Sequence, residues 1–191
     1  FVNEFSEITD MLRKIERAIL ANNVFVSGSI AAYDDSWTKE KVDEFCYKLS
    51  KRLIKEDYRV TSGFGVGIGS SIINGAMDEI YSSKYRHMDE HICLRPFPQG
   101  ISDNEERMRR WTEYRTHIFE ENGIAIFLFG NKIENENTVI ADGCLQEFEI
   151  AKKFGCTIIP IGSTGYAAEK IFDEIMDNKE QYDYLQDKLE I

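Results

Sequence analysis

The sequence lacks a long hydrophobic run and lacks paired cysteines. Of its 191 residues, 42% are hydrophobic, which suffices for one sizeable core, but no stretch matches a membrane span or a signal segment. The cysteines are scattered without any C-x-x-C pair, so neither a disulfide framework nor a zinc site is indicated. We therefore expect a cytoplasmic protein with reduced thiols and no membrane partner. The four cysteines are Cys46, Cys93, Cys144 and Cys156.

Positive charge is also scarce. The chain has 23 basic and 34 acidic residues, a formal net charge of -11, which repels nucleic acid and anionic membranes. A nucleic-acid partner is therefore not expected. Four arginines lie close together between 107 and 115, after Arg95, which favours a small anionic ligand, although a solvated helix face would explain the same cluster.

The common nucleotide fingerprints are absent from the most glycine-rich stretch, residues 58–77. A G-x-G-x-x-G motif fails because Ile68 or Ser70 stands where the third glycine belongs, and no lysine follows to make a P-loop. The order of a short β-type run, alternating glycines and a helix start nevertheless predicts a phosphate-binding loop. A tight turn with close helix packing is the alternative. The alternating glycines are Gly63, Gly65, Gly67 and Gly69.

Apolar spacing predicts strands alternating with helices. We expect strands at 24–26, 58–61, 91–94, 124–129 and 156–161. Helices are expected at 4–21, from 38, 69–83, 104–121, from 143, and after 165, where the last helices hold Ile171 and Ile175 and include one at 178–191. Small-residue turns are expected after the strands, at 27–29 and 162–165 among others, and a polar loop over 131–142 is the longest break in the pattern.

This alternation predicts an α/β fold, a Rossmann-like doubly wound parallel sheet of about five strands with helices on both faces. We expect a single domain over 1–191, with the helix at 1–21 linking to an upstream domain. The first residue is Phe1 rather than Met, which indicates either a processed chain or, as we prefer, a piece excised from a longer protein.

In such sheets, ligands bind outside the carboxyl ends of the strands, so the turns that follow the strands form the candidate site. Arg115 and Lys132 could neutralise a diphosphate, and Glu147 could accept hydrogen bonds from ribose hydroxyls or a base amine. A carboxylate favoured by a helix N-terminus is the alternative for Glu147. The other candidate ligand-binding residues are Gly28, Ser29, Gly63, Phe64, Gly65, Gly67, Arg95, Pro96, Phe97, Gly130 and Asn131.

The sequence gives less support to metal binding and to catalysis. His87 and His91 would not share a helical face, because His91 falls at a predicted strand start, and no third ligand is evident, so no metal is predicted. No catalytic residue is assigned. Tyr33, Trp37, Phe97 and Trp111 are candidates for stacking on a base, with core packing preferred for Trp111.

Residues 143–147, Gly-Cys-Leu-Gln-Glu, resemble the G-T-x-x-E end of the motif of LOG phosphoribohydrolases, members of the SLOG superfamily. Arg115 also falls where those enzymes have an arginine ahead of the central strand. Two departures are clear: the Pro-Gly-Gly that precedes the motif is missing, and Cys144 stands for Thr. Cleavage of nucleoside monophosphates by a LOG-like reaction is therefore kept as the alternative function.

A closer resemblance covers nearly the whole chain and rests on segments 26–29, 62–70, 95–98, 124–132 and 147–153. Together they look like the C-terminal SLOG domains of effectors in Thoeris anti-phage defence. The resemblance implies a non-catalytic sensor, without a cofactor, for a cyclic ADP-ribose isomer made by a partner TIR-domain enzyme. It also implies an upstream sirtuin-like NADase that ligand binding activates, and a homo-oligomer. A plain NAD-binding domain is disfavoured by the failed fingerprint.

Overall fold

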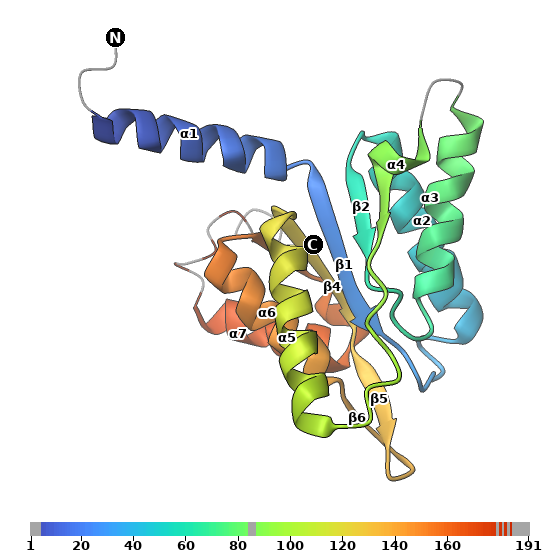
Figure 1. Ribbon diagram of the computed structural model, residues 1–191. Helices are drawn as coiled ribbons and strands as arrows, with labels where there is room; N and C mark the ends of the chain where they lie inside the picture. Colours follow the sequence, from blue (N-terminus) through green and yellow to red (C-terminus); the bar gives the residue numbers. More distant parts are fainter. Residues whose placement is uncertain (1–4, 84–86, 179, 181, 183, 185–191) are drawn as a thin grey trace.

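A five-stranded parallel sheet forms the centre of the fold in the computed structural model, which describes residues 5–83, 87–178, 180, 182 and 184 (Figure 1). The spatial order is β3-β2-β1-β4-β7, and every neighbouring pair is parallel. This confirms the predicted Rossmann-like architecture. The strands are β1 (Asn23–Ser29), β2 (Arg59–Ser62), β3 (Ile92–Leu94), β4 (Ile124–Phe129) and β7 (Thr157–Pro160).

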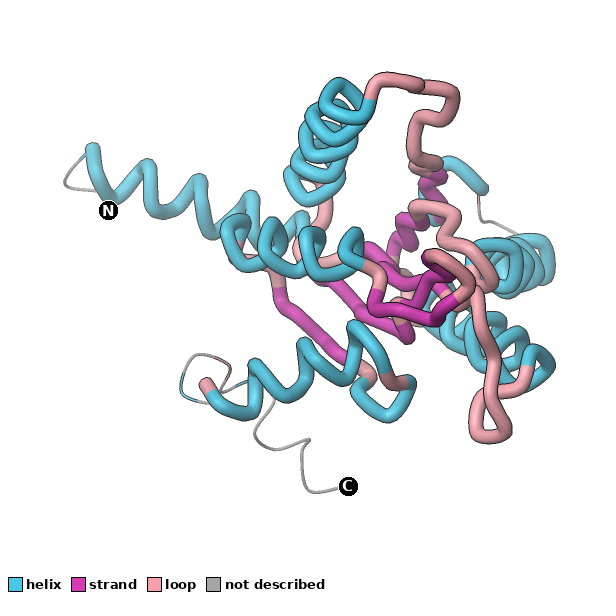
Figure 2. Tube along the Cα trace, turned by 90° about the horizontal axis from the view of Figure 1, so that it is seen from below, coloured by secondary structure: helices cyan, strands magenta, loops and turns pink. Residues whose placement is uncertain are grey.

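Helices cover both faces of the sheet, as predicted (Figures 1 and 2). Successive strand residues point to opposite faces, so Val24 and Val26 enter one core cluster and Phe25 the other. The first cluster packs against α2 (Lys39–Lys55) and α3 (Gly69–Ser82). The second packs against α5 (Asn104–Glu120), α6 (Asp142–Phe154) and α7 (Tyr166–Asp177). The short elements α4 (Met88–His91) and η1 (Gly162–Thr164) complete the order.

The predicted N-terminal helix is present as α1 (Phe5–Leu20), which extends from the body like an arm (Figure 1). Its junction is fixed where the N–H of Gly123 donates to the carbonyl of Leu20. Its role as a link to another domain stays a prediction. The helix predicted for 178–191 falls mostly outside the described residues.

The predicted loop over 131–142 is wrong, because the chain there forms an antiparallel hairpin of β5 (Asn131–Glu134) and β6 (Asn137–Ile140). The two turn residues, Asn135 and Glu136, both have positive φ, 49° and 64°, as a tight primed hairpin turn requires. α6 begins at Asp142, directly after the hairpin.

The turn predicted at 27–29 is also wrong. β1 continues to Ser29, because Ser27, Gly28 and Ser29 pair with Phe127, Leu128 and Phe129 of β4. Among the described residues, no helix has the length and apolarity to cross a membrane, and no group of His, Cys, Asp and Glu side chains is placed to hold a metal ion.

Candidate functional site

A buried polar cluster connects α5, α6 and β1 near the carboxyl end of the sheet. The Nε of Arg115 lies 3.3 Å from Oε1 of Glu147, and Oγ of Ser27 donates to Oε2 of Glu147 over 2.6 Å. The Arg115 and Glu147 side chains are 7% and 9% exposed. Burial raises the pKa of the Glu147 carboxyl, while the neighbouring Arg115 charge and the Ser27 hydroxyl act in the opposite direction. The carboxyl group is therefore already engaged by protein groups.

Aromatic rings enclose the guanidinium of Arg115. Its Cζ atom lies 4.8 Å from the ring centroid of Phe97 and 5.9 Å from that of Trp111. Nη1 donates to Oε1 of Gln146 over 3.1 Å. Gly143 makes room for this arrangement, because a Cβ atom there would lie 2.8 Å from Nη2 of Arg115. The glycine that resembles the LOG motif therefore lets Arg115 approach the start of α6.

Lys132 is the accessible cation of the predicted set. It lies on β5, and its Nζ is 2.6 Å from Oδ1 of Asp142 and 3.5 Å from a carboxylate oxygen of Glu134. The hydrogen bond to Asp142 raises the pKa of Lys132, so the amine stays charged at neutral pH. Because its side chain is 38% exposed, an anionic ligand can reach it.

A hollow of about 600 Å³ separates the hairpin from α5 and the loop after β3. Lys132, Arg107 and Trp111 line it, so two cations and an indole face the same space. The other lining residues are Gln99, Gly100, Ile101, Asn104, Met108, Glu134 and Asp142.

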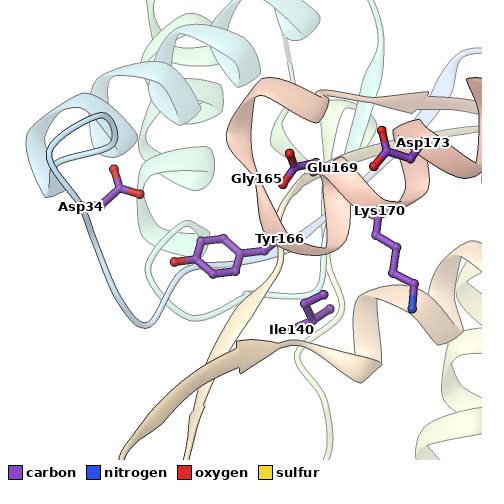
Figure 3. A pocket seen from close by; sticks show the side chains of 7 residues that line it. All are labelled: Asp34, Ile140, Gly165, Tyr166, Glu169, Lys170 and Asp173. Atoms are coloured by element: carbon purple, nitrogen blue, oxygen red, sulfur yellow. The ribbon is translucent and has the colours of Figure 1, made fainter.

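A second hollow lies between the loop after β1 and the start of α7 (Figure 3). Figure 3 shows Tyr166 extending toward the loop that carries Asp34. The charged groups there are Asp34, Glu169 and Asp173 with one cation, Lys170. Because carboxylates prevail, this hollow suits an anionic nucleotide less well than the one beside Lys132.

The glycine loop packs closely against the end of β1. A Cβ atom on Gly65 would lie 1.9 Å from the carbonyl oxygen of Gly28, and one on Gly67 would lie 2.1 Å from that of Ile30. The N–H of Ile30 also donates to the carbonyl of Val66. These contacts support the close-packing alternative for those two glycines, and a phosphate-binding role for the loop stays a prediction.

The remaining loop candidates differ in accessibility. Phe64 adopts a positive φ of 58° and is 53% exposed, so its ring faces solvent beside the glycines. Gly63 contacts Phe97, because a Cβ atom there would lie 3.3 Å from that ring. Pro96 is exposed, whereas Arg95 pairs with Glu121 at the end of α5, 2.9 Å away, and so is not brought together with Arg115 and Lys132.

Asn131 is fully buried and holds the loop after β1 in place. Its Oδ1 accepts from the N–H groups of Ala31 and Ala32, over 2.7 and 3.1 Å, and its Nδ2 donates to the carbonyl of Ala32. Ser29 donates through Oγ to the carbonyl of Asn131, and the N–H of Gly130 donates to the carbonyl of Ser29. These three candidates act as scaffold in this structure.

Three polar residues that were not predicted contact the predicted site residues: Ser27 bonds to Glu147, Gln146 to Arg115 and Asp142 to Lys132. Asp142 carried a detectable signal, since it is an acidic residue at the start of the predicted helix that follows Lys132. Trp37 packs against Phe45 and Phe129 rather than standing free for a base. Tyr33 is partly exposed.

One family model and several curated proteins match this chain over nearly its whole length. The model of the Sir2- and TIR-associating SLOG family, abbreviated STALD, matches residues 7–191. The chain is 38% identical over 181 residues to NAD(+) hydrolase ThsA of Bacillus cereus (strain MSX-D12), covering 95% of this chain and 37% of that protein. NAD(+) hydrolase ThsA of Acinetobacter baumannii (strain 532279) is 37% identical, and the match covers 95% of this chain and 39% of that protein. NAD(+) hydrolase ThsA of Enterococcus faecium is also 37% identical, and the match covers 98% of this chain and 38% of that protein. The chain thus spans well under half the length of these curated relatives.

Proposed function

This chain belongs to the Sir2- and TIR-associating SLOG family, and from that premise we propose that it is a sensor domain for a cyclic ADP-ribose isomer. In this proposal the signal is made by a TIR-domain enzyme, and its binding activates a sirtuin-like NADase in the same polypeptide. The matched relatives are named NAD(+) hydrolases and are longer than this chain, which supports the second part of the proposal.

The observation that carries the proposal is the placement of Arg115, Lys132 and two aromatic rings around one end of the sheet. A cyclic ADP-ribose isomer has two phosphates, two riboses and a base. Lys132 and Arg107 face the hollow and would hold the phosphates by charge. The indole of Trp111 lines the same hollow and offers a stacking surface for the base.

Arg115 and Glu147 would act less directly on the ligand than Lys132. Nη2 of Arg115 points to the start of α6 beside Gly143, and an anion there would receive a charge-assisted hydrogen bond. Glu147 fixes the orientation of the guanidinium through Nε. The Gly63–Gly69 segment and the exposed ring of Phe64 would form the opposite wall.

A sensor must bind its ligand more tightly in the active arrangement than in the resting one. In this structure Lys132 is bonded to Asp142, at the first residue of α6. A phosphate that took Lys132 would release this bridge between the hairpin and α6. We propose that this exchange is the first step of the response.

The proposal is tested by calorimetry with a panel of cyclic ADP-ribose isomers. We expect stoichiometric binding of at least one isomer, loss of most affinity in Lys132→Ala, and unchanged affinity in Lys153→Ala, which removes an exposed lysine at the far end of α6. Absence of heat with every isomer, or equal affinity of the Lys132→Ala variant, would refute it. Ligand-stimulated NAD hydrolysis by the full-length protein tests the link to the NADase.

A LOG-like phosphoribohydrolase is the second candidate, and it is favoured by the geometry of residues 143–147, where Gly143 lets Arg115 approach the start of α6 and Glu147 contacts that arginine. Burial raises the pKa of the Glu147 carboxyl, in the direction that acid catalysis at a glycosidic bond would need. Cys144 offers no nucleophile at neutral pH, because burial raises the pKa of its thiol to about 12. Chromatography after incubation with nucleoside monophosphates distinguishes the candidates. Release of free base that Glu147→Gln abolishes would favour the enzyme over the sensor.

A further inference from the structure

The arm formed by α1 exposes an apolar stripe that the body leaves uncovered. Phe5 is 84% exposed and Ile8, the least exposed of the stripe, still 44%. Leaving such side chains in water is unfavourable relative to burying them. The stripe consists of Phe5, Ile8, Leu12, Ile15 and Ile19, with Met11 beside it.

The spacing of this stripe indicates the kind of surface that covers it. From Phe5 to Ile19 the steps alternate strictly between three and four residues, the heptad pattern of a coiled-coil seam. A helix that packs on a globular core has a broader apolar face. The seam therefore fits another helix with the same repeat, and α1 of a second copy supplies one.

The surface around the C-terminal end of α1 continues the seam. Arg13, Glu16 and Leu20 line a shallow groove along the helix and also line a hollow between α1 and the body. Phe119 and Phe154 contribute apolar surface to that hollow. In an antiparallel pair of α1 helices, Phe5 of the second copy would lie over this end and could enter the hollow.

Charge favours the antiparallel orientation. Glu7 and Asp10 lie in the first half of α1, whereas Arg13 and Lys14 lie in the second half with one acid, Glu16. Antiparallel pairing places the acidic half of one helix beside the more basic half of the other, and parallel pairing would place like halves together.

We propose that α1 is a self-association element, in which two copies of this chain pair through antiparallel α1 helices along the stripe from Phe5 to Ile19. The contact is reciprocal, with Phe5 of each copy seated in the hollow beside Leu20 of the other. The pairing is independent of the proposed ligand site, which lies at the opposite end of the strands.

Sedimentation equilibrium of the 191-residue chain over a dilution series tests the pairing. We expect the average mass to approach twice that of one chain on concentration, and Leu12→Glu/Ile15→Glu to stay monomeric. Lys170→Glu changes the net charge by the same two units on an exposed position of α7, away from α1, and is expected to associate like the wild type. A wild type that stays monomeric throughout, or a double variant that still associates, overturns the proposal. Unchanged far-UV circular dichroism and melting of the body show that the variants remain folded.

Cysteine crosslinking tests the orientation. The four native cysteines are all buried, so introduced thiols dominate oxidation. An equimolar mixture of Phe5→Cys and Ile19→Cys chains is expected to form the mixed disulfide dimer preferentially, because antiparallel pairing brings these positions together. Preferential dimers of Phe5→Cys with itself would show parallel pairing and contradict the proposal.

Discussion

Nε of Arg115 lies 3.3 Å from Oε1 of Glu147, 32 residues further along the chain, and both side chains are buried. The pair joins α5 to α6, and Ser27 joins it to β1 through the other carboxyl oxygen. Three elements that surround the carboxyl end of the sheet are therefore held by one carboxyl group.

Removing that carboxyl group should be costly. Glu147→Ala leaves the buried Nε of Arg115 and the hydroxyl of Ser27 without their acceptor, and we expect a loss of about 1 to 3 kcal/mol in the free energy of unfolding for each of these groups. Glu147→Gln keeps an oxygen that accepts from Ser27 or Arg115 and should lose much less. Urea unfolding of the two variants at neutral pH measures the difference, and equal losses would contradict the assigned role of the carboxyl oxygens.

The raised pKa of Glu147 predicts that the free energy of unfolding depends on pH. Burial raises the pKa of Glu147 above its ordinary value of 4.5, so the folded state binds its proton more tightly than the unfolded state. The resulting stabilisation is complete below pH 4.5 and is lost as the pH rises through the folded pKa. Glu147→Gln should therefore gain stability relative to the wild type as the pH rises above 4.5 and through the folded pKa of the wild-type carboxyl. Unfolding titrations at several pH values test this, and a constant difference would show that the carboxyl pKa is unshifted.

Lys132→Ala should leave stability nearly unchanged. Its ion pairs with Asp142 and Glu134 are solvent-accessible, and such pairs contribute at most about 1 kcal/mol. Thermal unfolding without ligand tests this. A small change here, together with lost ligand affinity, would assign Lys132 to binding rather than to the scaffold.

Gly65→Ala should disrupt the glycine loop. The added methyl group would lie 1.9 Å from the carbonyl oxygen of Gly28, which belongs to a central strand and has little freedom to move. In the matched variant Gly63→Ala the added methyl group would lie 3.3 Å from the Phe97 ring and at an ordinary contact distance of 3.7 Å from the Phe25 ring, so this variant should lose much less stability. Comparison of their melting temperatures is decisive, and similar values would show that the loop moves freely against β1.

Asn131→Ala removes one acceptor for two backbone N–H groups and one donor to a carbonyl, all at the loop after β1. We expect a loss of at least about 2 kcal/mol, because the buried side chain satisfies groups that would otherwise lack partners. Asn137→Ala, at the exposed start of β6, should change stability by no more than about 0.5 kcal/mol. Denaturant unfolding compares them, and equal effects would refute the scaffold role of Asn131.

The sheet was predictable because its strands are short apolar runs separated by helical spacing. The hairpin at 131–140 was not, since its turn is Asn135-Glu136 rather than the Asn-Gly or Asp-Gly that signals a primed turn. Arg115, Lys132 and Glu147 were identified as a set because the segments at the carboxyl ends of parallel strands gather at one edge of the sheet, where ligands bind, and the resemblance of residues 143–147 to the LOG motif agrees with this. That Glu147 binds Arg115 and Ser27 could not be predicted, because the contact depends on how α5 and α6 approach each other.

The contact of Gly65 with Gly28 has a mechanical consequence for the edge of the sheet. On that side, the atom nearest to a Cβ on Gly65 would be a backbone oxygen at 1.9 Å, and the side chain of Ile68 would lie further away at 3.5 Å, so a rotamer change can absorb little of a displacement. On the other side, Lys132 is attached through a long, partly exposed side chain and a two-stranded hairpin. A displacement between the two sides is therefore expected to move the hairpin more than the glycine loop.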